Sequence, residues 1–143
     1  MASRSVVLCV DDEPTLLRTF PIALGRAGFR VAVADDGATG LALFRQLRHE
    51  VCLVLTDIIM PRMSGIDMAE RILQLEPQTK ILLMSAYTGE AGRRQGHRRG
   101  FPFIRKPFNY ATLVEKIHSI ATVPEAATVS RGRASRRSRR NNA

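Results

Sequence analysis

The sequence predicts an α/β fold in which five strands and five helices alternate around a parallel sheet. Five short apolar runs alternate with segments of helical length. The runs that are continuously apolar are typical of strands buried on both faces of such a sheet. A chain of 143 residues, 45% of them hydrophobic, suffices for about one domain of this kind.

The pattern of apolar residues predicts the bounds of each strand and helix. The predicted strands are residues 6–10, 30–34, 51–56, 80–84 and 101–104. The predicted helices are residues 14–27, 38–47, 65–75 and 110–121, with one more between residues 88 and 100. This order of buried strands and helices predicts that helices cover both faces of the sheet.

The first two helices contain residues that disturb helical structure. Pro14 suits the first turn, where its missing N–H costs nothing, and Gly28 ends the apolar pattern. Pro21 lies inside the first helix and removes a hydrogen bond, so we predict a kink there and not a break. A break would leave two segments too short to cover the sheet. Gly40 weakens the second helix.

The later helices differ in strength. Residues 65–75 place apolar side chains at helical spacing, and residues 110–121 form one apolar stripe after Asn109, a good N-cap. Residues 88–100 contain four glycines, and each interior glycine costs a helix about 1 kcal/mol relative to alanine. We predict that this helix is poorly ordered without phosphate or a partner.

Composition sets limits on the class of protein. No apolar run reaches the roughly 18 residues of a membrane helix, and the N-terminal run is too short for a signal peptide. We therefore expect a cytoplasmic protein without membrane contact. Cys9 and Cys52 lie in apolar runs, and we expect both to be reduced and buried.

The net charge of +9 is unevenly distributed. Residues 125–143 contain six arginines and one glutamate, which supply +5 of it. Residues 123–143 also lack apolar periodicity, so we predict a basic, disordered tail after a domain at residues 5–122.

Polar side chains follow four of the five predicted strands. They are Asp11, Asp12 and Glu13 after the first strand, Asp57 after the third, Ser85 after the fourth, and Lys106 after the fifth, behind Arg105. In parallel sheets of this type, ligands bind beyond the carboxyl ends of the strands. These residues are therefore the candidates for a functional site.

Each of these residues has an ordinary explanation when it is taken alone. Acidic residues suit the start of a helix, and a single aspartate, serine or lysine is common in turns and caps. Together they indicate more, because three carboxylates at one edge repel one another unless a cation neutralises them. Such oxygen ligands suit Mg²⁺, and a carboxylate can act as a nucleophile toward phosphorus.

The strand ends carry four specific motifs. They are Val10-Asp11-Asp12-Glu13-Pro14, Thr56-Asp57-Ile58-Ile59-Met60-Pro61 with Ser64-Gly65, Met84-Ser85-Ala86-Tyr87, and Lys106-Pro107-Phe108. In combination they resemble the receiver domain of two-component response regulators, over about residues 5–121. The resemblance implies a (βα)5 flavodoxin-like three-layer sandwich with a five-stranded parallel sheet of order 2-1-3-4-5.

The resemblance also implies a phosphoacceptor and a metal site. Asp57 is expected to accept a phosphoryl group from a phosphohistidine of a sensor histidine kinase or phosphotransfer protein. Asp12, Asp57 and the backbone carbonyl of Ile59 are expected to bind Mg²⁺ or Mn²⁺ directly. Asp11 is expected to act mostly through a metal-bound water.

Further residues are expected to respond to the phosphoryl group. Lys106 would pair with it, and its bond to Pro107 is expected to be cis, which is true of only about 5% of X–Pro bonds. Ser85 would hydrogen-bond the phosphoryl group and move inward, with Tyr87 following as a second switch residue. Gly65 is expected to need a positive φ in the loop after strand three.

This reading makes the protein a signalling switch and not an enzyme acting on external substrates. Phosphorylation would change the face formed by helix four, strand five and helix five, which an unknown downstream protein would read. Two other functions stay open. The arginines of residues 93–105 and of the tail could bind nucleic acid. A phosphatase or hydrolase ranks last, because no additional acid–base residue is placed for an external substrate.

Overall fold

The computed structural model describes residues 4–86 and 100–121, which form five strands and four helices. The strands are β1 (Val6–Val10), β2 (Arg30–Ala34), β3 (Val51–Asp57), β4 (Ile81–Ser85) and β5 (Phe103–Arg105). The helices are α1 (Pro14–Arg26), α2 (Gly37–Leu47), α3 (Gly65–Leu75) and α5 (Tyr110–Ala121). All strand pairs are parallel in the order β2-β1-β3-β4-β5, which confirms the predicted fold and strand order.

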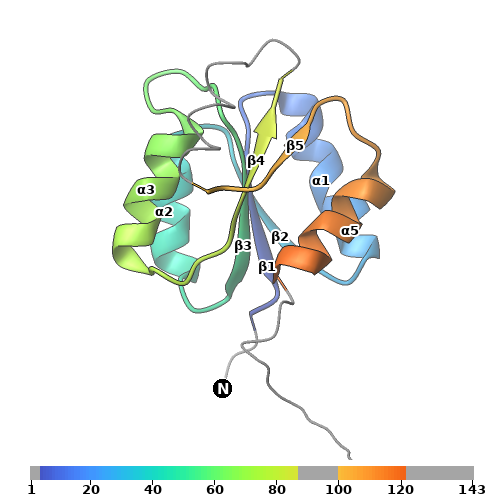
Figure 1. Ribbon diagram of the computed structural model, residues 1–143, viewed down its shortest axis with the longest axis horizontal. Coiled ribbons are helices and arrows are strands. Elements are labelled where there is room, and N and C mark those ends of the chain that lie inside the picture. The colour runs from blue at the N-terminus through green and yellow to red at the C-terminus, as the bar shows by residue number, and fades with distance from the viewer. Residues whose placement is uncertain (1–3, 87–99, 122–143) are drawn as a thin grey trace, which may run out of the picture.

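Three layers are visible in Figure 1, with α2 and α3 on one face of the sheet and α1 and α5 on the other. Alternate residues of each strand point to opposite faces, so the sheet builds two separate cores. Leu8 and Val10 pack on the α2–α3 side, whereas Val7 and Cys9 pack on the α1–α5 side. This double burial explains why β1 is continuously apolar.

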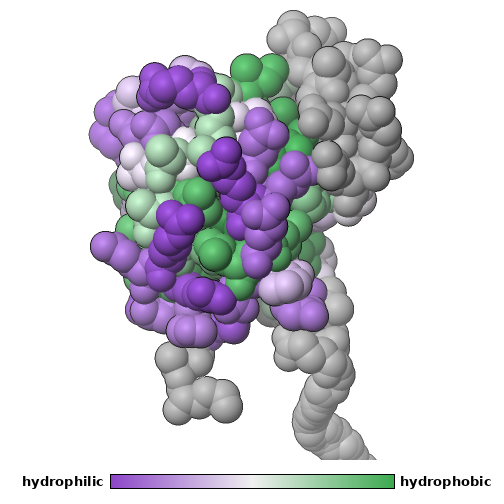
Figure 2. Space-filling model, turned by 90° about the vertical axis from the view of Figure 1, so that its left-hand side faces the viewer, coloured by the Kyte–Doolittle hydropathy of each residue, from purple (hydrophilic) through white to green (hydrophobic). Residues whose placement is uncertain are grey.

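The α2–α3 side is displayed in space filling in Figure 2. Hydrophobic side chains reach the surface there between hydrophilic ones. Leu43, Leu47 and Leu73 are among the partly buried residues that border the core on this side. Within the described residues, no helix is long and apolar enough to cross a membrane.

Three strands, β3, β4 and β5, end one residue later than predicted. Asp57 is the last residue of β3 and pairs with Met84, and Ser85 is the last residue of β4 and pairs with Arg105. Asp57 and Ser85 therefore lie within the hydrogen-bonded sheet and not in the loops after it. The predicted start of β5 at residue 101 was wrong, because pairing with β4 begins at Phe103.

The first helix continues through its internal proline. α1 runs unbroken from Pro14 to Arg26 with Pro21 inside it, which confirms that this residue does not break the helix. Gly28 follows the helix with a φ of 97°, a conformation that glycine adopts without strain. The predicted kink at Pro21 stays a prediction.

Short polar side chains start the other three helices. Asp36 accepts a hydrogen bond from the Thr39 amide at 2.7 Å, and α2 therefore begins at Gly37, one residue before the predicted start. Asn109 accepts from the Thr112 amide at 2.7 Å, as predicted for an N-cap. Ser64 accepts from the Asp67 amide at 3.0 Å and caps α3 in the same way.

Two further expectations are refined by packing. An added Cβ at Gly40 would lie 2.8 Å from the Met68 sulfur and 3.0 Å from a Val10 methyl, so this glycine lets α2 approach the sheet.

Cys9 is buried and Cys52 is only half-buried, and both thiols are free. The helix predicted between residues 88 and 100, and the tail at residues 123–143, lie outside the described residues.

Candidate functional site

Three carboxylates meet at the carboxyl edge of the sheet. β1 and β3 are parallel neighbours with Val10 opposite Thr56, so the residues that follow this pair, Asp11 and Asp57, emerge side by side. One oxygen from each of Asp11, Asp12 and Asp57 lies within 4.8 Å of the others. Asp11 is fully buried, Asp57 is 8% exposed, and Asp12 is exposed to solvent. The prediction that residues at the ends of separate strands converge at one edge of the sheet is confirmed for these three residues.

A single ammonium group enters this cluster from the loop after β5. Nζ of Lys106 donates a hydrogen bond to Oδ2 of Asp11 at 2.8 Å and lies 3.4 Å from Oδ2 of Asp57. The Lys106 amide donates to the Ser85 carbonyl at 2.8 Å, which holds the loop against β4. The bond from Lys106 to Pro107 is cis, as predicted.

The charges of the site are incompletely balanced. Burial raises the pKa of Asp57, and the neighbouring carboxylates of Asp11 and Asp12 add to that effect, while Lys106 opposes it. Burial by itself would lower the pKa of Lys106, but its hydrogen bond to Asp11 and the charge of Asp57 raise it overall. Among the described residues, one ammonium therefore faces three carboxylates, and this excess of negative charge favours a further cation.

The donor set fits a hard divalent cation. Mg²⁺ and Mn²⁺ prefer oxygen ligands, and Mg²⁺ keeps several waters when it binds to a small number of carboxylates. Asp12 offers an exposed carboxylate, and Asp57 offers one at the edge of the core. Both oxygens of Asp11 are already engaged, because Oδ1 accepts from the Glu13 amide at 2.9 Å and Oδ2 accepts from Lys106.

Ser85 lies at the same edge of the sheet. It is fully buried, and its hydroxyl donates to the Ala86 carbonyl at 3.2 Å. The Ile58 amide donates to the Met84 carbonyl at 3.1 Å, which fixes the end of β3 against the end of β4. Tyr87, the second predicted switch residue, lies outside the described residues.

The loop after Asp57 corrects one prediction. Gly65 does not adopt a positive φ; the left-handed residue of this loop is Arg62, with a φ of 70°. Gly65 is needed for a different reason, since an added Cβ would overlap the backbone carbonyl oxygen of Asp57. That carbonyl also accepts a hydrogen bond from the Thr56 hydroxyl at 2.9 Å. Ile59, two residues after Asp57, is 62% exposed.

An ion pair between this loop and α2 was not predicted from the sequence. Arg62 lies 3.4 Å from Asp36, and the ion pair joins the loop to the first turn of α2. Both residues lie at the surface, and they are 26 residues apart in the chain. No pattern in the sequence signals such a pair.

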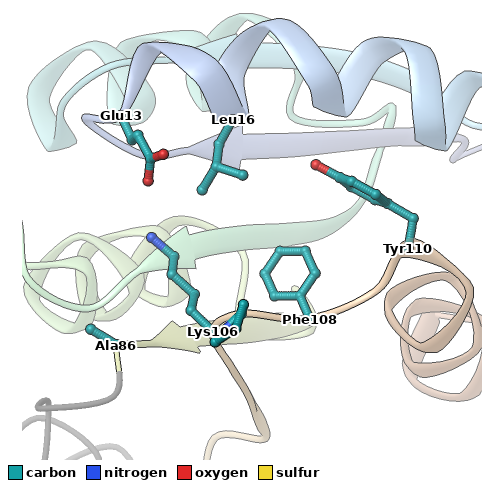
Figure 3. A pocket seen from close by; sticks show the side chains of 7 residues that line it. Glu13, Leu16, Ala86, Lys106, Phe108 and Tyr110 are labelled. Carbon is teal, nitrogen blue, oxygen red and sulfur yellow. The ribbon is translucent and has the colours of Figure 1, made fainter.

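A cavity of about 430 Å³ adjoins the site on the α1 side. Its lining residues are Glu13, Leu16, Ala86, Lys106, Pro107, Phe108 and Tyr110. Figure 3 shows Glu13 and Leu16 at the start of α1 on one side, with Lys106 and Phe108 facing them from the loop after β5. The cavity therefore separates this loop from the first turn of α1.

Comparison with known proteins gives a consistent result. A family model described as the response regulator receiver domain matches residues 7–118. The DNA-binding response regulator MtrA of Mycolicibacterium smegmatis is 34% identical over 117 residues, which cover 81% of this chain and 50% of MtrA. The response regulator receiver protein CpdR of Brucella abortus is 31% identical over 116 residues, which cover 80% of this chain and 94% of CpdR. The chain spans about half the length of several relatives that it matches, MtrA among them.

Solved structures agree with the sequence comparisons. A response regulator receiver domain protein of Clostridium thermocellum has a TM-score of 0.75 and 25% identity, covering 83% of this chain and 93% of its own. The chemotaxis protein CheY4 of Vibrio cholerae has a TM-score of 0.72 and 28% identity, covering 84% of this chain and 98% of its own.

Proposed function

The chain belongs to the response regulator receiver domain family, and on this basis we propose that it is a signalling switch phosphorylated on Asp57. The observation that supports the choice of residue most directly is the placement of one ammonium group between two of three clustered carboxylates. Lys106 contacts Asp11 and Asp57 at once, at the edge of the sheet where Asp57 reaches the surface.

In the proposed transfer, a carboxylate oxygen of Asp57 attacks the phosphorus of a phosphohistidine. The phosphorus–nitrogen bond breaks, the imidazole leaves with the bonding electron pair, and an acyl phosphate forms on Asp57. Phosphoryl transfer depends mainly on positioning and on neutralising charge. Lys106 can supply both, because it is held 3.4 Å from Asp57 by its hydrogen bond to Asp11.

We propose Asp12, Asp57 and the backbone carbonyl of Ile59 as direct ligands of Mg²⁺ or Mn²⁺. When bound, the cation would neutralise the negative charge that carboxylates and phosphoryl oxygens concentrate at this edge. An indirect role for Asp11 is supported by its two hydrogen bonds, which already occupy both carboxylate oxygens.

The proposed readout of phosphorylation begins at Ser85. Within the described residues, its hydroxyl makes a long hydrogen bond, at 3.2 Å, to the carbonyl of the next residue. We propose that this hydroxyl turns to a phosphoryl oxygen once Asp57 is modified. Because Ser85 pairs with Arg105, a shift at the end of β4 would pass to β5 and on to α5, the face proposed to change on activation.

The proposed partners are a sensor histidine kinase or phosphotransfer protein as donor and a downstream protein as target. The proposed receiver unit comprises residues 5–122. MtrA is named as a DNA-binding regulator, but this chain spans half of it. The nucleic-acid alternative rests on the arginines of residues 93–105 and of the tail. Of these, Arg105 lies at the exposed end of β5, whereas the others lie outside the described residues, and that alternative stays a prediction.

Phosphorylation by a small donor tests this function. Wild-type protein incubated with acetyl phosphate and Mg²⁺ should gain the mass of one phosphoryl group, and Asp57→Asn should not. Asp67→Asn is the matched control, since Asp67 is an exposed aspartate in the first turn of α3. A folded wild-type protein that gains no mass, or an Asp57→Asn variant that does, contradicts the proposal.

A further inference from the structure

The loop that carries Lys106 is supported unevenly. At its start, the Lys106 amide bonds to the Ser85 carbonyl at 2.8 Å. Further along, the cavity of about 430 Å³ separates Lys106, Pro107 and Phe108 from the first turn of α1 (Figure 3). The middle of the loop therefore borders open space on the side that faces the first turn of α1.

A chain of three aromatic rings connects this loop to the core between the sheet and α1. Phe108 and Tyr110 meet edge to face, with ring centroids 5.7 Å apart and an interplanar angle of 89°. Tyr110 and Phe20 meet in the same way, at 6.3 Å and 82°. Phe20 is fully buried in α1, so it is a fixed anchor. Such edge-to-face pairs are favourable beyond the area they bury.

The hydroxyl of Tyr110 takes little part in this arrangement. Its oxygen is buried and forms no hydrogen bond of standard geometry within the part of the chain that the structure describes, although Thr19 lies near enough to oppose slightly the rise that burial causes in the pKa of Tyr110. The ring makes both aromatic contacts, and these contacts survive if the hydroxyl is removed. A function of Tyr110 that depends on ring packing should therefore be preserved in phenylalanine and lost in a small aliphatic residue.

We propose that Tyr110 is a positioning residue for phosphorylation, which holds the loop so that the Lys106 ammonium stays beside Asp57. This inference rests on the proposed function of Asp57. Lysine has a long, flexible side chain, and the position of its ammonium depends on where the backbone of the loop lies. Tyr110 fixes that backbone through Phe108, although it touches neither carboxylate of the site.

Phosphorylation kinetics of folded variants test the proposal. With acetyl phosphate and saturating Mg²⁺, Tyr110→Ala should be phosphorylated about tenfold more slowly than wild type, since small misplacements of a catalytic group cost this much or more. Tyr110→Phe should stay close to the wild-type rate. Ile117→Ala is the matched control, because Ile117 is a fully buried residue of the same core, two turns further along α5.

A double-mutant cycle separates positioning from general loosening of the fold. If Tyr110 acts through Lys106, the double variant Lys106→Ala with Tyr110→Ala should be no slower than Lys106→Ala alone. If Tyr110→Ala fails to fold, as judged by circular dichroism, Tyr110→Leu takes its place in the same cycle. The inference would be overturned if the double variant were slowed by the product of the two single-variant factors, or if the folded Tyr110 variant were phosphorylated at the wild-type rate. Absence of phosphorylation in the wild type would instead overturn the proposed function.

Discussion

Nζ of Lys106 donates a 2.8 Å hydrogen bond to Oδ2 of the fully buried Asp11, although 95 residues separate them in the chain. The contact joins the loop after β5 to the end of β1, on opposite sides of β3 in the sheet. Asp57, at the end of β3, lies between these two elements and within 3.4 Å of the same ammonium. The strand order alone thus brings together the charges of the site.

The clustering of carboxylates has a consequence for stability. Without divalent cations, Asp57→Asn should raise the free energy of unfolding at neutral pH by on the order of 1 kcal/mol. The reason is that burial and the neighbouring carboxylates raise the pKa of Asp57, so the folded state disfavours its charged form. Urea unfolding in EDTA measures the difference. Mg²⁺ should stabilise the wild type more than the variant, and a less stable variant in EDTA contradicts this account.

Gly65 should tolerate no side chain. Gly65→Ala is expected to lower the free energy of unfolding by about 3 kcal/mol, because the added Cβ would overlap the carbonyl oxygen of Asp57. Gly25→Ala is the matched control, since nothing lies within 4 Å of the Cβ that it adds to α1. That control should be stabilised by about 0.5–1 kcal/mol. Equal effects of the two substitutions would show that close packing at Asp57 is not what requires glycine.

The cap of α2 predicts a dependence of stability on pH. The backbone hydrogen bond from Thr39, with a smaller contribution from Arg62, lowers the pKa of Asp36 below its usual value of 3.8. An acid with a lowered folded-state pKa stabilises the fold above its unfolded pKa and loses that contribution as the pH falls through the folded value. The stability difference between wild type and Asp36→Asn should therefore be full at neutral pH, begin to shrink as the pH falls below 3.8, and disappear only below the lowered folded-state pKa of Asp36. A difference that does not change with pH would exclude the charge of Asp36 as its cause.

The two thiols should differ in reactivity. Burial raises the pKa of both, and Cys9 is fully buried in β1 whereas Cys52 is half-buried in β3. A thiol reagent added to native protein should modify Cys52 slowly and leave Cys9 intact until the protein unfolds. Cys52→Ala should abolish native-state labelling. Rapid labelling of Cys9 in that variant would mean that β1 is less protected than the structure indicates.

Sequence reasoning was most successful where a residue pattern depends on a regular element. The alternation of strands and helices, the cap at Asn109 and the convergence of Asp11, Asp12 and Asp57 follow from periodicity and from the geometry of parallel sheets. The strand ends were misplaced by a residue or two, because pairing across the sheet, and not local preference, decides that Asp57 and Ser85 lie within strands. No local signal marks such pairing.

Contacts between loops were beyond the reach of the sequence. Gly65 was correctly selected as a constrained position, but the constraint is contact with the Asp57 carbonyl and not backbone conformation. The pairing of Arg62 with Asp36 and the stacking of Phe108 on Tyr110 depend on how separate segments meet. The residues proposed to perform the chemistry were predictable from strand ends, whereas the residues proposed to position them were not.

The measurement that tests the central claim most directly is chemical trapping of the phosphorylated residue. After incubation with acetyl phosphate and Mg²⁺, borohydride reduces an acyl phosphate on aspartate to homoserine, which peptide mass spectrometry can locate. The account predicts homoserine at position 57 and at no other aspartate. Trapping at Asp11 or Asp12, or recovery of an unmodified position 57 from protein that has gained a phosphoryl group, would contradict it.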